Sequence, residues 1–219
     1  LLTSNPNFDL TKYIPILEKE VRSFGLNVTI TEKEKSIDSN IKSAFLKGNT
    51  KEHLMLFYTN QPLIGISDTE LIKIKFEVDI NPPKYATFER QYRLLPAPFE
   101  VNLYDSSSLF AGKIHAVICR SWKHRVKGRD LYDYVFYLAR RTPVNIPHLR
   151  ERLIQTGYIS QEDACALENV KEFLNTRFET IDYEQAKEDV LPFIRDHSSL
   201  NLWSANFFKQ ITNGLIEAS

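Results

Sequence analysis

The strongest constraint in this sequence is the segment Leu71–Ile80, in which apolar and charged side chains alternate. Successive side chains of a β-strand point to opposite faces, so the alternation predicts a strand with one core face and one charged face. The next residues are Asn81, Pro82 and Pro83. Because proline has no backbone N–H to donate, we expect the strand to end there. The predicted core face carries Ile72, Ile74, Phe76, Val78 and Ile80.

Other periodic segments surround this strand. Before it, we predict a helix over residues 10–24 and strands over 26–31 and 41–47; after it, a strand over 99–103. From residue 106 the pattern is helical, and predicted helices cover 106–120, 130–140, 160–177, 183–194 and 202–216. Ser160 and Asp163 resemble a capping box at the start of the third of these helices. Strands followed by helices are typical of the α+β class, with a boundary near residues 142–147.

Charge is uneven along the chain, although 28 basic and 28 acidic residues cancel overall. Residues 113–141 contain eight basic and two acidic residues, a net charge of +6. Residues 161–196 contain ten acidic and four basic residues, a net charge of −6. The basic stretch is either a solvated helix face or a site for an anionic partner.

Several classes of protein are disfavoured by what the sequence lacks. Cys119 and Cys165 fall in helical patterns without CxxC spacing, which disfavours structural zinc and disulfides and favours a reducing, cytoplasmic setting. No apolar run is long enough to span a bilayer, so we expect no membrane partner. His115 and His124 have no partner at a metal-ligand spacing, and we expect structural roles for them. GxSxG, HExxH and P-loop motifs do not occur.

Two acidic residues lie on the charged face of the 71–80 strand. Glu77 and Asp79 are two residues apart, so their side chains project from the same face about 6–7 Å apart. Neighbouring carboxylates on a rigid strand can hold a divalent cation. Lys73 and Lys75 can equally neutralise them as surface ion pairs, and the sequence leaves both interpretations open.

A basic block precedes the predicted helix that begins near residue 130. Gly128 permits a tight turn, and Asp130 is predicted to cap the helix with its carboxylate. Lys127 and Arg129 then lie beside a helix N-terminus, a combination that suits a polyphosphate. Asp133 follows one turn later on the same face. Capping with salt bridging and anion binding both remain open.

Three ordered blocks, Ile72–Pro83, Leu109–Arg120 and Arg125–Tyr134, resemble the AbiEii/AbiGii toxin family. These are nucleotidyltransferase-like proteins of bacterial toxin–antitoxin and phage-defence systems. The resemblance implies a polymerase β-like nucleotidyltransferase sheet, N-terminally incomplete in this chain, followed by a C-terminal helical bundle. We therefore expect a nucleotidyltransferase-like core in residues 1–142 and a helical domain in residues 143–219.

The resemblance also implies roles for individual residues. Asp79 matches the third metal-binding carboxylate of the family, with Glu77 as its near alternative, and Mg²⁺ is the implied cofactor. The implied catalytic residues are Asp79, Lys113 and Asp130. The implied nucleotide-binding residues are Lys75, Lys127, Arg129 and Asp133.

The implied reaction is metal-dependent transfer of a nucleotide from a nucleoside triphosphate to an acceptor such as tRNA. The family's first motif, Gly-Ser followed by Asp-x-Asp, does not occur ahead of Lys75, so we expect this chain to be inactive without it. The alternative is a noncatalytic module that binds RNA or a partner protein, and the acidic segment is a candidate surface for a cognate antitoxin. The enzyme hypothesis depends on Asp79, Lys113 and Asp130 meeting around one cavity.

Overall fold

A computed structural model describes residues 1–219 except 6, 34–39, 58–64, 96, 122–125 and 219. The chain divides into two compact units, Leu1–Pro82 and Pro83–Ser219. Small antiparallel sheets come first and helices follow, which confirms the α+β class. The finer assignment to a polymerase β-like sheet, and the expected domain boundary after residue 142, stay predictions.

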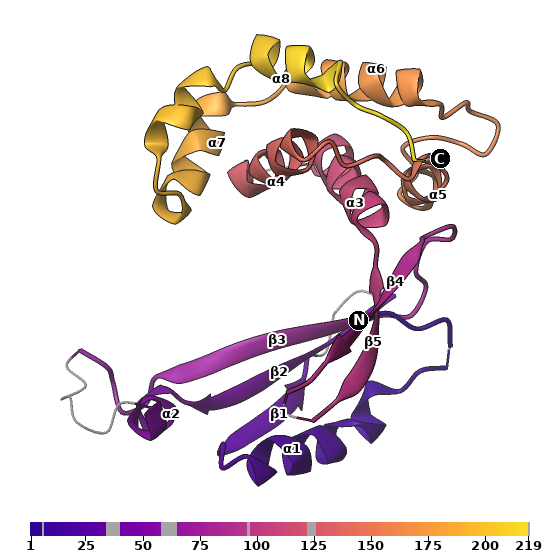
Figure 1. Ribbon diagram of the computed structural model, residues 1–219. Coiled ribbons are helices and arrows are strands. Elements are labelled where there is room, and N and C mark those ends of the chain that lie inside the picture. The colour runs from indigo at the N-terminus through magenta and orange to yellow at the C-terminus, as the bar shows by residue number, and fades with distance from the viewer. Residues whose placement is uncertain (6, 34–39, 58–64, 96, 122–125, 219) are drawn as a thin grey trace. The chain divides into compact units, whose positions relative to one another are not determined.

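The first unit is built on a three-stranded antiparallel sheet with strand order β1-β2-β3. Helix α1 packs along β1 (Figure 1). Ser43 of β2 lies opposite Glu77 of β3 in the register. The elements are the 3₁₀ turn η1 (Leu10–Lys12), α1 (Ile14–Ser23), β1 (Val28–Glu32), β2 (Ile41–Asn49), α2 (Thr50–Phe57) and β3 (Leu71–Asp79).

The face of β3 was only partly predicted. Val78 is buried as expected, with 4% of its surface exposed, and it packs in a small core with Leu10, Ile30 and Ala44. Ile74 is 55% exposed, although it belongs to the predicted core face. Ile74 stays exposed because α1 packs on β1, at the opposite edge of the sheet from β3. One helix placed there can bury only part of β3.

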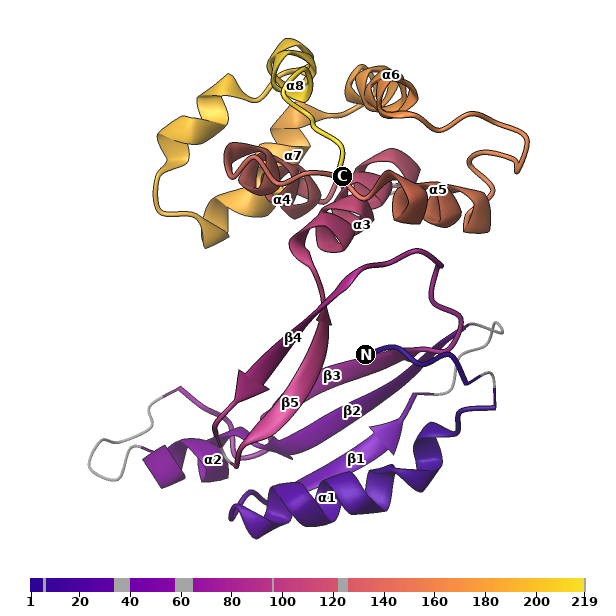
Figure 2. The ribbon, with the colours of Figure 1, turned by 45° about the vertical axis from the view of Figure 1, so that its right-hand side comes forward.

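The second unit begins with an antiparallel hairpin, in which Phe88 lies opposite Tyr104, and continues with α-helices. Helices α6 and α8 lie side by side (Figure 2). The elements are β4 (Phe88–Arg93), β5 (Phe99–Tyr104), α3 (Ser106–Cys119), α4 (Gly128–Ala139), α5 (Ile146–Gln155), α6 (Leu167–Phe178), α7 (Tyr183–Val190), η2 (Leu191–Phe193), η3 (His197–Leu202) and α8 (Ala205–Thr212).

Aromatic side chains fill the centre of the second unit and hold α4 in place. Tyr134 of α4 is fully buried, with its ring centroid 5.8 Å from that of Phe178 of α6 and 6.5 Å from that of Phe208 of α8. Its hydroxyl lies 2.7 Å from the hydroxyl of Thr212, so the buried polar group has a partner. Burial raises the pKa of Tyr134 above its usual range. The inner face of α4 is therefore fixed, and its first turn is held at a defined place.

Several sequence expectations need correction. Helix α6 begins at Leu167 rather than near Ser160, because the Asp163 carboxylate accepts from the Ser160 N–H in a tight turn that precedes the helix. Cys165 lies in the loop before α6, not in a helix. Elements α2, β4 and α5 were not predicted. His124 and the rest of the basic connection 122–125 lie outside the described residues. No helix in the described ranges is both long and apolar enough to cross a membrane.

Candidate phosphate-binding site

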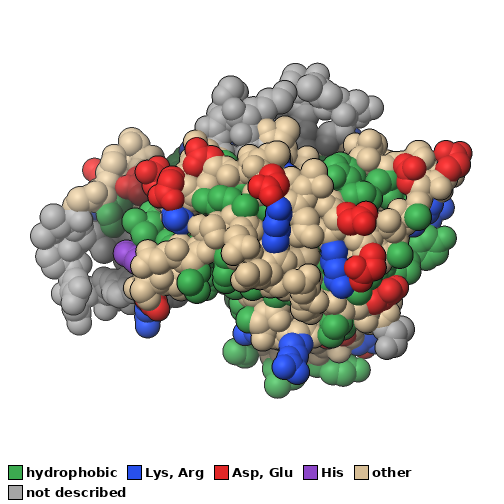
Figure 3. Space-filling view, turned by 90° about the horizontal axis from the view of Figure 1, so that it is seen from above, with side chains coloured by type: hydrophobic (Ala, Val, Ile, Leu, Met, Phe, Trp, Pro, Cys, Tyr) green, Lys and Arg blue, Asp and Glu red, His purple; other side chains and the backbone are tan. Residues whose placement is uncertain are grey.

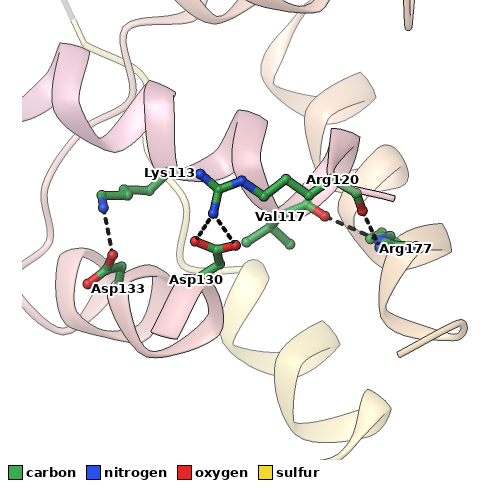
Figure 4. A network of polar contacts seen from close by, with 6 residues as sticks. All are labelled: Lys113, Val117, Arg120, Asp130, Asp133 and Arg177. Atoms are coloured by element: carbon green, nitrogen blue, oxygen red, sulfur yellow. Dashed lines mark hydrogen bonds and ion pairs between the residues drawn. The ribbon is translucent and has the colours of Figure 1, made fainter. Parts of the chain in front are cut away.

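Helices α3 and α4 meet through two ion pairs (Figure 4). The ammonium of Lys113 on α3 lies 2.6 Å from a carboxylate oxygen of Asp133 on α4. One guanidinium nitrogen of Arg120, which caps the C-terminal end of α3, lies 2.7 Å from each carboxylate oxygen of Asp130. Three residues implied by the family resemblance, Lys113, Asp130 and Asp133, are thus brought together at one helix interface.

The first turn of α4 is positioned by a close approach to α7. A Cβ atom added at Gly128 would lie 1.9 Å from the backbone oxygen of Ala186, so only glycine fits between the helices here. The Val126 N–H donates to the side-chain oxygen of Gln185, which ties the same turn to α7. Helix α4 therefore begins at Gly128, with Lys127 in the capping position. The prediction that Asp130 caps the helix is wrong, because Asp130 already lies within the first turn.

The two ion pairs differ in burial and hence in what they do. The Asp130 side chain is 4% exposed, and burying a carboxylate without a cationic partner is costly. Arg120 supplies that partner and is itself 44% exposed. Lys113 and Asp133 are 39% and 33% exposed, in the range where an ion pair contributes about 0–1 kcal/mol. Lys113 can therefore exchange its partner for a bound anion, whereas Asp130 is held in place.

A cavity of about 490 Å³ opens beside the start of α4. Lys127 and Arg129 both line it, so the cations at the two positions flanking Gly128 face the same space. Tyr132, one turn along α4 and 43% exposed, adds an aromatic surface. The remaining wall comes from the end of α7 and the turn after it: Asp189, Val190, Phe193 and Ile194. Two cations at a helix N-terminus beside apolar rings suit an anion that carries an aromatic group.

The acidic residues of β3 lie in the first unit and have partners there. The Lys75 ammonium lies 2.6 Å from a carboxylate oxygen of Glu77, and the Ser43 hydroxyl donates to the same oxygen at 3.2 Å. The Asp79 carboxylate accepts from the Asn81 N–H at 3.0 Å. The surface ion pair that the sequence left open for Glu77 is present. The meeting of Asp79 with Lys113 and Asp130 at one cavity stays a prediction.

The two carboxylates of β3, Glu77 and Asp79, limit which metal ions this strand can bind. Among the described residues, no group of three or more His, Cys, Asp or Glu side chains is arranged around a possible metal position. Mg²⁺ in nucleotide sites commonly takes one or two carboxylates and completes its shell with phosphates and water. Asp79 fits that role as a single ligand, whereas Glu77 would have to release Lys75 first. The residues present suit one cation rather than a pair.

Two functional candidates were missed by the sequence analysis. Arg120 was counted only as part of the basic stretch, yet it is the ion-pair partner of the buried Asp130 side chain. Tyr132, for which the sequence analysis assigned no role, lines the cavity. Asp130 could have predicted a cationic partner such as Arg120, because an acidic side chain on the buried side of a helix requires a cation nearby.

The fold and this site define an α+β protein with a cavity that is lined by two cations at the start of a helix. Residues 1–208 match the family described as nucleotidyl transferase AbiEii toxin of type IV toxin–antitoxin systems. The chain belongs to this family, since the match covers nearly all of its 219 residues. The family implies an antitoxin partner and nucleotide substrates in general. No curated protein and no solved structure matches the chain.

Proposed function

We propose that this chain binds the phosphates of a nucleoside triphosphate at the start of α4 and serves metal-dependent transfer of the nucleotide to an acceptor such as tRNA. One observation carries the proposal: Lys127 and Arg129 line the same cavity at a helix N-terminus, beside the ring of Tyr132. Fixed cations and free backbone N–H groups at such a position stabilise polyphosphates. The ring of Tyr132 offers a stacking surface for the base.

Each residue of the site then has a distinct role. Lys127 and Arg129 bind and orient the triphosphate, and Lys113 exchanges Asp133 for a phosphate oxygen. Asp130 acts through Arg120 as a positioning residue, since its carboxylate is buried against that guanidinium. Mg²⁺ would neutralise charge on the phosphates when it is bound. Catalysis in this chemistry is mainly positional and electrostatic, which agrees with a site rich in cations.

The test is binding of labelled ATP and GTP to the chain by equilibrium dialysis at low salt, with and without Mg²⁺. Lys127→Ala and Arg129→Ala each remove a charge from the cavity wall, and we expect each to weaken binding at least tenfold. The matched control is Lys171→Ala on α6, where the ammonium lies 2.8 Å from Glu168 on the same helix. This control should bind as the unchanged chain does. Equal affinities for Lys127→Ala and Lys171→Ala, or no binding at all with Mg²⁺, would contradict the proposal.

A second candidate function is a noncatalytic module that binds RNA or a protein. The observation that favours it is that both α3 cations at the interface, Lys113 and Arg120, are paired with acids of α4, as a purely structural arrangement requires. Such a module would bind a short RNA without any nucleoside triphosphate and without Mg²⁺. It would also be indifferent to Lys113→Met, which should weaken triphosphate binding if Lys113 contacts phosphate.

The acidic segment 161–196 is the candidate surface for the antitoxin. On the face seen in Figure 3, Asp and Glu side chains are interspersed with Lys and Arg. Two ion pairs lie within single helices of this segment: Lys171 contacts Glu168 and Lys187 contacts Glu184, each three residues away. The net charge of −6 already counts both lysines, so these pairs leave the acidic excess in place, and the segment stays a candidate surface for a basic partner.

A further inference from the structure

A second cavity lies in the Pro83–Ser219 unit, where α3 ends beside the turn that follows α5. Its volume is about 500 Å³, and it shares no lining residue with the cavity at the start of α4. Two arginines from different helices line it, Arg120 at the end of α3 and Arg177 of α6. Among the described residues that line it there is no Asp or Glu. The wall is therefore cationic.

The guanidinium of Arg177 is held in one orientation. Its Nε donates to the backbone oxygen of Val117 at 3.2 Å, and its Nη2 donates to that of Arg120 at 2.7 Å (Figure 4). These carbonyls belong to the last turn of α3, where helix oxygens lack partners within the helix. A third bond runs from Nη1 to the hydroxyl of Thr180 at 3.1 Å. The charge of Arg177 is thus fixed at the cavity wall before any ligand binds.

Arg120 forms an ion pair with Asp130 and also lines the cavity. Its Nη1 donates to the two carboxylate oxygens of Asp130. Within the part of the chain that the structure describes, its Nε and Nη2 have no hydrogen-bond acceptor, and its side chain is 44% exposed. Counting Arg120, Arg177 and Asp130 together leaves one net positive charge at this wall. The donors that remain on Arg120 are available to a ligand.

Neutral donors and a neutral histidine complete the wall. Ser121 and Thr156 contribute hydroxyls, and the Thr156 hydroxyl lies 3.2 Å from Nε2 of His115. Burial, which is the largest cause, and the charges of Arg152 and Arg120 together lower the pKa of His115 to about 4. His115 is therefore uncharged at neutral pH. Its low pKa also agrees with a positive potential at this place.

We propose that this cavity binds a phosphate group carried by a nucleotide, with the two guanidiniums on the phosphate oxygens and the ring of Tyr158 beside the base. Planar guanidiniums match phosphate oxygens in geometry and charge. Tyr158 is 42% exposed and is packed edge-on against Phe173, with ring centroids 5.3 Å apart. The cavity volume lies within the range of small-ligand sites, roughly 300–1,000 Å³. This site does not require the transfer reaction proposed above, although Arg120 is also the partner of Asp130 there.

The experiment places a carboxylate on the cavity wall. Ser121 is exposed, so Ser121→Glu should fold normally, and the matched control is Ser106→Glu, an exposed serine at the other end of α3. Both substitutions are made in a Lys127→Ala, Arg129→Ala background, so that the first cavity contributes little. The probes are fluorescently labelled AMP and a 5′-phosphorylated six-nucleotide RNA, followed by fluorescence anisotropy at low salt. Thermal melting confirms that both variants are folded.

We expect Ser121→Glu to weaken binding at least tenfold relative to Ser106→Glu. Binding of AMP would identify a free nucleotide as the source of the phosphate, and binding of the RNA alone would identify the end of a strand; either outcome supports the site. Equal affinities of the two glutamate variants would overturn the proposal, as would binding of neither probe to the background chain. Failure here leaves the test of Lys127 and Arg129 unaffected, because that test uses different residues and nucleoside triphosphates.

Discussion

Substitution of Gly128 by alanine tests how the candidate site is positioned. The added Cβ would lie 1.9 Å from the Ala186 oxygen, whereas real Cβ contacts are essentially never under 3.0 Å, so α4 and α7 must separate by at least 1.1 Å (3.0 − 1.9). The clashing atom is backbone and cannot rotate away, which places the cost at the upper end of the usual overpacking range, about 3 kcal/mol. Alanine recovers about 1 kcal/mol of helix propensity. We expect a net loss of about 2 kcal/mol in the free energy of unfolding.

The assay is urea unfolding followed by circular dichroism, with Gly112→Ala as the control. Gly112 also lies in a helix, α3, but a Cβ there would have its nearest neighbour at 3.5 Å, on the flexible side chain of Arg152. Gly112→Ala should therefore be neutral or stabilise the chain by up to about 1 kcal/mol. Equal stability of the Gly128→Ala variant and the unchanged chain would refute the reasoning. A shift of the same sign and size in both variants would also refute it.

Three further predictions concern single side chains. Asp133→Asn frees Lys113, so triphosphate binding should tighten while the free energy of unfolding changes by less than about 1 kcal/mol, measured by dialysis and urea unfolding. Between about pH 6.5 and pH 4 the folded chain keeps its buried His115 neutral, whereas the unfolded chain protonates it. The free energy of unfolding should therefore decrease as the pH is lowered through this range, by up to about 1.4 kcal/mol per pH unit. His115→Gln should reduce this slope. Tyr134→Phe removes the bond to Thr212, and urea unfolding should show a loss of about 1 kcal/mol.

Local patterns predicted most of the fold, and the exceptions have physical causes. The strand Leu71–Asp79 and helix Ser106–Cys119 lie close to their predicted bounds, although only Val78 of the predicted core face of the strand is buried. Helix α5 was not predicted, although Pro147 is compatible with it: the proline occupies the start of the helix, where its missing N–H has no partner to lose. The Asn145 carboxamide caps this helix by accepting from the His148 N–H at 3.0 Å. A capping asparagine followed by proline was the available signal.

The site was less predictable than the fold, because its defining contacts join residues far apart along the chain. Sequence spacing drew attention to Lys127, Arg129 and Asp130, and Lys127 and Arg129 do face one cavity. Spacing alone gave no reason to pair Asp130 with Arg120, since that contact depends on how α3 crosses α4. The close approach at Gly128 depends on α7, more than fifty residues later.

These long-range contacts decide how the acid of the family's last block is interpreted. A free Asp130 at a helix start would repel a triphosphate, but a buried Asp130 neutralised by Arg120 does not, and it orients that guanidinium instead. Asp130→Asn keeps the side-chain shape and removes the charge, so it should release Arg120 while leaving Lys127 and Arg129 at the cavity. We therefore expect Asp130→Asn to retain triphosphate binding within about threefold, well below the tenfold change that 1.4 kcal/mol represents. A loss of binding as large as that caused by Lys127→Ala would show that Asp130 contacts the nucleotide itself.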